Sequence, residues 1–207
     1  MKRHSAPRPF DQRKRIAFLW GIALATGFVL IFGQPAVSDE NVLHELLETT
    51  GLVFIAAAVF GRLWSILYIG GKKNRVLVID GPYSMTRNPL YFFSLTGLVG
   101  IGLIFSSLVL ALALLAAGGL LFGYTAYREA DYLRSRFGPA YEAYEARTPF
   151  FLPDPRLYQS AEQVTFSAAA LGRSFRDCLP LLAIYPVNEF IEQLRGTGYL
   201  SPLFYLP

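Results

Sequence analysis

The residues with the clearest chemical potential are a basic helix start, two tyrosines and one acid, namely Tyr83, Arg87, Asn88, Pro89, Tyr91 and Glu129. Asparagine is a good N-cap and proline suits the first helical turn, so a helix is predicted to begin at Pro89. Free backbone amides at a helix start, beside an arginine, favour a carboxylate or phosphate. Aromatic rings suit a purine or a cation. With the carboxylate of Glu129, this set would suit a zwitterionic cofactor that carries a purine.

The elements that must position these residues are predicted to be membrane helices. Apolar residues make up 53% of the chain and charged residues 16%, and the mean hydropathy is +0.37. This composition is typical of an integral membrane protein. Stretches long enough, or nearly so, to cross about 30 Å of hydrocarbon as helices are residues 16–33, 46–70, 90–105 and 108–127.

The third and fourth stretches are predicted to form a tight helical hairpin, because only Ser106 and Ser107 separate them. Its arms are nearly equal, so Glu129 returns to the level of Arg87. The helix of the fourth stretch is predicted to continue to Phe137, before the Gly-Pro pair that stops one helix and starts another. Glu129 would then lie at or just beyond the cytoplasmic interface.

The distribution of basic residues predicts the orientation. Residues 34–46 contain no Lys or Arg, whereas residues 1–15 are strongly basic and the connection after the second stretch carries Lys72, Lys73, Arg75 and Arg87. Because Lys and Arg beside spans stay on the cytoplasmic side, both termini and that connection are predicted to be cytoplasmic. The first stretch is predicted to be a true span, since no small-x-small cleavage site clearly follows it.

Other classes of site are disfavoured by the composition. The single cysteine, Cys178, excludes an internal disulfide and a multi-cysteine metal site, and packing is its expected role. His4 and His44 are predicted to lie on opposite sides of the membrane, so they would not share a metal. No nucleic-acid module is recognisable. We therefore expect membrane lipids and a lipophilic molecule as partners, without metal or nucleic acid, and the oligomeric state is left open.

The chain is divided into a membrane core, residues 1–153, and an interfacial C-terminal extension, residues 154–207. In the extension, Val187, Phe190, Ile191 and Leu194 recur with the period of an amphipathic helix, while 178–185 is too short to span. The extension is predicted to lie on the membrane or to cover the helical core.

Arg62 follows an apolar run and has two possible orientations. It either faces the helix bundle, where it would neutralise an acidic lipid or an acceptor carboxylate, or it extends to the inner interface beside Trp64 and Tyr68.

An ordered set of residues resembles a known family. It comprises Gly81-Pro-Tyr-Ser-x-x-Arg87-Asn-Pro-x-Tyr91 and, after the hairpin, Glu129-x-x-x-Leu133-x-x-x-Phe137-Gly138-x-x-Tyr141-x-x-Tyr144-x-x-Arg147-x-Pro149. Over about residues 61–153 this set is similar to the isoprenylcysteine carboxyl methyltransferase and phospholipid N-methyltransferase superfamily. The resemblance implies an all-α polytopic membrane enzyme with about four spans. It also implies a cytoplasm-facing S-adenosylmethionine pocket and a lipid acceptor that enters from the bilayer of the bacterial inner membrane.

The resemblance also implies roles for individual residues. Glu129 and Arg87 would be catalytic, and the cofactor would contact Tyr83, Arg87, Asn88, Pro89, Tyr91 and Glu129. The acceptor would contact Arg62, Tyr141, Tyr144 and Arg147, although the last three could equally anchor the chain at the interface. Two positions depart from the family pattern: Asn88 stands where many members have histidine, and Ala130 where many have a second acid.

The expected function is methyl transfer from S-adenosylmethionine to an isoprenylcysteine-like carboxylate or a lipid. A carboxylate acceptor is already ionised, whereas the amine of phosphatidylethanolamine must first lose a proton. Asn88 cannot carry a proton at neutral pH, which favours the carboxylate. A phospholipid N-methyltransferase is the first alternative, and a non-catalytic membrane scaffold of the same fold is the second.

Overall fold

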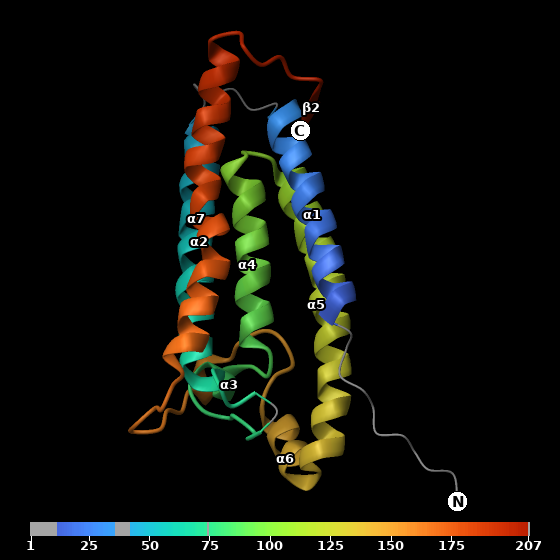
Figure 1. Cartoon of the computed structure of the whole chain (residues 1–207), viewed down its shortest axis with the longest axis vertical. Coiled ribbons are helices and arrows are strands. Elements are labelled where there is room, and N and C mark those ends of the chain that lie inside the picture. Colours follow the sequence, from blue (N-terminus) through green and yellow to red (C-terminus); the bar gives the residue numbers. More distant parts are fainter. Residues whose placement is uncertain (1–11, 36–41, 74, 207) are drawn as a thin grey trace, which may run out of the picture.

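The computed structural model describes residues 12–35, 42–73 and 75–206. The described residues form α1 (Gln12–Phe32), β1 (Gly33–Pro35), α2 (Val42–Ile69), α3 (Pro82–Met85), α4 (Pro89–Ile104), α5 (Leu108–Phe137), α6 (Pro139–Arg147), the 3-10 helix η1 (Pro155–Leu157), α7 (Ala168–Gly196) and β2 (Phe204–Leu206). The long helices lie side by side in one elongated bundle (Figure 1). The predicted all-α class is confirmed.

The α4–α5 hairpin is as tight as its sequence predicted. α4 ends at Ile104 and α5 begins at Leu108. Ser106 adopts a positive φ of 51°, and the Ser107 hydroxyl caps α5 by accepting a hydrogen bond from the Leu110 amide at 3.2 Å. α5 then runs unbroken to Phe137, as predicted, and Gly138 ends it with a φ of 53°. One rigid helix therefore joins the hairpin tip to the other end of the bundle.

α2 and α4 pack backbone against backbone. A Cβ atom added to Gly51 would lie 2.6 Å from the Ile104 amide nitrogen and 2.8 Å from the Gly100 carbonyl oxygen. Such a close approach is available only to small residues. The contact fixes the position of α4, and therefore of the residues at its start.

We expect Gly51→Ala to lower the free energy of unfolding by about 1 to 3 kcal/mol, because the new methyl group meets backbone that cannot rotate away. Thermal melting in detergent measures this loss. The matched control is Gly119→Ala on α5, where nothing lies within 4 Å of the added Cβ; alanine is the better helix former there. Equal melting of both variants would show that the α2–α4 contact is not close.

Two of the described helices, α2 and α5, are long and apolar enough to cross a membrane. Residues 16–32 of α1 and all of α4 are apolar but shorter. Large apolar side chains point outward, for example Phe60 and Leu120, which are 71% and 77% exposed. Such outward surfaces suit contact with lipid.

The predicted amphipathic pattern of the C-terminal extension lies within a longer helix. α7 is a single helix of 29 residues that packs along α2 and α4 (Figure 1). Its buried residues are Ser174, Cys178, Asn188 and Ile191. Of the two predicted placements, it takes the one that covers the core, and Cys178 is a packing residue. Pro180 and Pro186 lie on its exposed side, so their rings leave the packed face intact.

The prediction that both chain ends lie on one face does not hold for the described residues. β2 pairs in parallel with β1, which directly follows α1. Near the end of α7, Arg195 donates to the carbonyl oxygen of Leu30 at the end of α1. The C-terminal strand therefore lies at the opposite end of the bundle from the start of α1 (Figure 1). The reason is α7, which adds one further pass along the bundle. Residues 1–11, with His4, lie outside the described part.

Candidate active site

A cavity of about 1050 Å³ lies at the end of the bundle where α4 begins. It is lined by nine of the residues predicted from the sequence, namely Arg62, Tyr83, Arg87, Asn88, Pro89, Tyr91, Glu129, Tyr141 and Tyr144. Arg147 does not line it and is exposed on α6. The two arms of the hairpin thus bring Arg87 and Glu129 to the same cavity.

The start of α4 is held by the segment that follows α6. The Arg87 amide donates to the Pro149 carbonyl oxygen at 2.9 Å, and the Thr86 hydroxyl donates to that of Phe151 at 2.9 Å. Asn88 occupies the N-cap position, but its side chain does not cap the helix as predicted. Its amide group donates instead to the Phe150 carbonyl oxygen at 2.8 Å. Asn88 therefore holds the segment around Phe150 against the start of α4, which borders the cavity.

Arg87 pairs with an acid that sequence reasoning missed. Its guanidinium donates to Glu145 of α6 and lies 5.1 Å from the centre of the Phe150 ring. Arg134 of α5 donates to the other Glu145 oxygen at 2.8 Å and also pairs with Asp131. The sequence did contain a sign of this role, because Glu145 directly follows Tyr144 and lies one helical turn after Tyr141.

The two arginines keep Glu145 ionised. Hydrogen bonds from Arg134, and then from Arg87, hold the pKa of the Glu145 carboxyl below its ordinary value of 4.5. Since this folded-state pKa lies below the unfolded one, the pairing contributes its full stability above the unfolded pKa. That stability is lost as the pH falls through the folded pKa.

Glu145→Gln is therefore expected to lower the free energy of unfolding by about 1 to 2 kcal/mol at neutral pH, because two charge-assisted hydrogen bonds weaken. The difference from the unchanged protein should shrink as the pH falls below about 4. Melting curves of both proteins across this range measure it. Glu142→Gln, at an exposed position of the same helix, is the control and should have no such pH dependence. A pH-independent difference would contradict the assigned ion pair.

Glu129 faces the cavity and forms an ion pair with Lys73 rather than with Arg87. The Lys73 Nζ atom lies 3.1 Å from Glu129 Oε1, and the lysine side chain is 47% exposed. Such an exposed pair is weak and can exchange for a ligand. Ala130, in place of a second acid, is buried beside Tyr141 and Tyr144. Asp131 pairs with Arg134 and does not line the cavity.

The four tyrosines predicted to form the site are buried. Tyr83 is 6% exposed, and burial raises the pKa of its hydroxyl well above the ordinary value, so it remains protonated. Tyr144 donates its hydroxyl to the Tyr83 carbonyl oxygen at 2.7 Å. Tyr91 stacks on Phe122 of α5, with ring centres 5.4 Å apart. Tyr83 is thus a neutral hydrogen-bond donor at the cavity wall, and Tyr91 offers a fixed aromatic surface.

Three buried polar atoms around the cavity have no hydrogen-bond partner among the described residues: the Tyr83 hydroxyl, Arg87 Nε and the Ser174 hydroxyl. Burying a polar group without a partner costs about 1 to 3 kcal/mol. Native proteins rarely leave such groups unsatisfied. These atoms are therefore available to hydrogen-bond a polar ligand in the cavity.

The sequence left two orientations open for Arg62, and in the structure its side chain faces the helix bundle. Its guanidinium donates to the Ser94 hydroxyl of α4 and lines the cavity. α7 adds residues that the sequence did not indicate, because they lie on the extension that was predicted to be interfacial. These are Ala170, Arg173, Ser174, Asp177 and Leu181.

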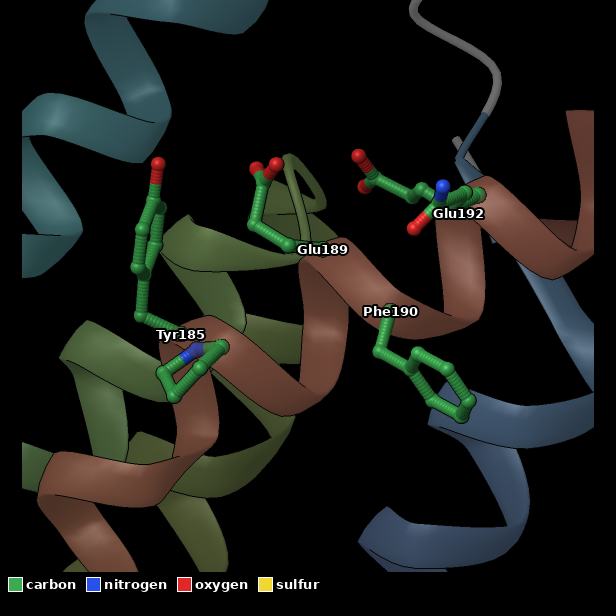
Figure 2. A pocket seen from close by; sticks show the side chains of 6 residues that line it. Tyr185, Glu189, Phe190 and Glu192 are labelled. Carbon is green, nitrogen blue, oxygen red and sulfur yellow. The ribbon is translucent and has the colours of Figure 1, made fainter.

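A second hollow lies on α7 and contains none of the predicted site residues. Its lining comes from this one helix, with Tyr185, Glu189 and Glu192 extending toward the same side (Figure 2). The Asn188 amide donates to Glu192 at 2.8 Å. In the described part of the chain, no group of three or more His, Cys, Asp or Glu residues is placed to hold a metal ion. The cavity at the start of α4 is therefore the candidate site.

Comparison with known proteins finds one family model and related metal resistance proteins. The family model for phospholipid methyltransferases matches residues 47–140. The nickel-cobalt-cadmium resistance protein NccN of Alcaligenes xylosoxydans xylosoxydans is 32% identical over 206 residues, which cover 98% of this chain and 96% of NccN. The cobalt-zinc-cadmium resistance protein CzcN of Cupriavidus metallidurans is 34% identical over 194 residues, which cover 92% of this chain and 88% of CzcN. No solved structure matches.

The matched family region contains α3, α4 and α5 with Arg87 and Glu129, and the two relatives match almost the whole chain. Together with the two long apolar helices, this family indicates association with a membrane. The chain therefore belongs to the same family as the metal resistance proteins NccN and CzcN, and its residues 47–140 match the phospholipid methyltransferase family model.

Proposed function

We propose that this protein is an integral-membrane methyltransferase that uses S-adenosylmethionine and acts on a lipophilic acceptor. The observation that carries the proposal is the cavity at the start of α4. There the family region supplies a basic helix start, a carboxylate, and buried donor atoms that have no hydrogen-bond partner among the described residues. Its volume of about 1050 Å³ is at the upper end for small-molecule sites. That volume suits a cofactor together with the head of an acceptor.

The residues present fit this cofactor. The Tyr83 hydroxyl and Arg87 Nε are donors for its carboxylate or hydroxyl groups, and Glu129 is an acceptor for its ammonium or ribose groups. Tyr91 offers its ring to the purine. When bound, the cofactor supplies a methyl group activated by a positively charged sulfur. Asn88, whose amide is engaged with Phe150, acts by positioning the wall rather than by proton transfer.

The contribution of the chain to the reaction is positioning and exclusion of water. Apolar side chains of α4 and α5, including Leu98, Phe122 and Ala126, line the cavity beside the charged residues. A water-poor site favours a reaction in which an anion meets a cation and both lose charge. Alignment of the two reactants supplies much of the rate enhancement. A carboxylate acceptor fits this site without a base, and the amine of phosphatidylethanolamine is the alternative. A scaffold that retains only the fold is the second alternative.

In the membrane, we propose that α1, α2, α4 and α5 cross the bacterial inner membrane with the cavity at the cytoplasmic face. The basic connection between α2 and α4 supports this orientation. We also propose that residues 1–153 form the membrane core and residues 154–207 a C-terminal extension of it. Because α7 lines the cavity, its residues would form part of the working site.

The names of the relatives support a physiological role. NccN and CzcN are named for resistance to nickel, cobalt, zinc and cadmium. We propose that methylation by this protein contributes to resistance to such divalent metal ions. A strain that lacks the gene should grow less well in cobalt or cadmium. The unchanged gene, but not Glu129→Gln, should restore growth.

The enzymatic proposal is tested with membranes that contain the protein and S-adenosylmethionine labelled on its methyl group. Label in an extractable lipid or lipophilic acid supports a lipid acceptor, and label in protein supports an isoprenylcysteine-like acceptor. Membranes with Glu129→Gln are the control. Cofactor binding without any transfer of label would favour the scaffold.

A further inference from the structure

α7 contributes a buried polar side chain to the cavity, and this side chain lies outside the region that matches the family model. Ser174 is 4% exposed, lines the cavity, and its hydroxyl has no hydrogen-bond partner among the described residues. α7 lies outside residues 47–140, the region that matches the family. A buried hydroxyl without a partner is costly unless a ligand or water satisfies it. Ser174 therefore offers a hydrogen-bonding hydroxyl to a ligand that reaches α7.

The charged residues that line the same cavity indicate which kind of ligand it would bind. Lys73 is paired with Glu129, and Arg87 with Glu145. Among the described residues, by contrast, neither Arg62 nor Arg173 forms an ion pair with a carboxylate, although both line the cavity.

Asp177, on the next turn of α7 after Arg173, is the remaining acid of this wall and also forms no ion pair among the described residues. The unpaired cations of the described lining thus outnumber its unpaired acids. An anionic group is the ligand that this surplus favours.

An apolar path adjoins these residues. Leu181 of α7, Ile66 of α2, and Ile16 and Leu19 of α1 line the same cavity. Ile16 is 48% exposed, so the apolar lining extends to the outer surface of the bundle. An apolar chain can therefore lie between these helices while its head remains at the arginines.

We propose that Arg62, Arg173 and Ser174 form a subsite that binds the anionic head of a lipid-like acceptor. This inference rests on the proposed methyltransferase function and specifies its substrate class. The shared chemistry is one anionic group, carboxylate or phosphate, on an apolar chain. Methylation of a carboxylate oxygen would form one C–O bond as the C–S bond of the methyl donor breaks. The bonding pair would stay on sulfur, and no proton would move.

The test measures binding of a dansyl-labelled fatty acid to the purified full-length protein in phosphatidylcholine nanodiscs, without cofactor. The acid should bind at least about tenfold more tightly than its uncharged methyl ester. Arg173→Ala should weaken binding of the acid about tenfold, and Ser174→Ala several-fold. Ser174→Ala removes no hydrogen bond that the described residues make, so the fold should be retained.

Arg176→Ala is the matched control, because Arg176 is an exposed arginine of the same helix outside the cavity. It should bind the acid as the unchanged protein does. Equal binding of acid and ester would overturn the subsite, as would equal weakening by Arg176→Ala and Arg173→Ala. Competition with oleate or with phosphatidic acid then shows whether the subsite prefers a carboxylate or a phosphate head group. Displacement of the labelled acid by either competitor agrees with an anion site.

Titration of the same samples with S-adenosylmethionine separates this inference from the proposed function. Arg173→Ala and Ser174→Ala should bind the cofactor as the unchanged protein does. Cofactor binding without preference for the acid would refute only the subsite. Preference for the acid without any cofactor binding would refute the methyltransferase and leave a lipid-binding site.

Discussion

Glu129→Gln is expected to weaken binding of S-adenosylmethionine about hundredfold, equivalent to about 2.7 kcal/mol. The carboxylate lines the cavity, and its partner Lys73 is half exposed, so its charge is available to a bound cation or hydroxyl. An amide of the same shape loses the charge-assisted part of that interaction. The fold should be retained, because an exposed ion pair contributes at most about 1 kcal/mol. Calorimetric titration and thermal melting measure the two effects.

Asp131→Asn is the matched control for this prediction. Asp131 is two residues away on α5, but it pairs with Arg134 and does not line the cavity. Its replacement should leave cofactor affinity unchanged. If both variants bind the cofactor as the unchanged protein does, Glu129 is not part of the cofactor site. If Asp131→Asn loses as much affinity for the cofactor as Glu129→Gln, both acids act through the net negative charge of this part of α5 and not through direct contact with the cofactor.

Arg87→Ala is expected to abolish detectable cofactor binding and to lower the free energy of unfolding by about 2 to 4 kcal/mol. The side chain is only 13% exposed, pairs with Glu145 and lies over the Phe150 ring. Removing this side chain is costly, because its charge-assisted bond to Glu145 and its packing on the Phe150 ring are both lost at a position largely shielded from water, even though Arg134 still bonds to Glu145. Arg87→Lys should restore part of the stability but less of the binding, because lysine lacks the planar guanidinium.

Arg134→Ala is the contrast, because Arg134 bonds to the same carboxylate from a side chain that is 41% exposed. Its loss should cost under about 1 kcal/mol. Thermal melting and cofactor titration of Arg87→Ala, Arg87→Lys and Arg134→Ala give the comparison. Equal destabilisation by the two alanine variants would mean that burial does not set the strength of these pairs.

Much of the fold was predictable because it depends on neighbouring residues. Apolar runs of helical length and the Ser-Ser break between them specify the α4–α5 hairpin. Pro89 starts α4, and the Gly138-Pro139 pair ends α5 as predicted. The hairpin then brings the start of α4 and the later turns of α5 to the same end of the bundle, where nine predicted residues line one cavity.

The amino-acid order was enough to specify α4, α5, their hairpin and the family motif, because capping, helix length and hydrophobicity act over a few residues. The partner of each charged side chain was not specified in this way. Arg87 bonds to a residue 58 positions away, Asn88 to one 62 positions away, and Lys73 to one 56 positions away. These partners, and the place of α7 in the cavity wall, depend on how whole helices pack, since only packing brings distant polar groups within hydrogen-bonding distance.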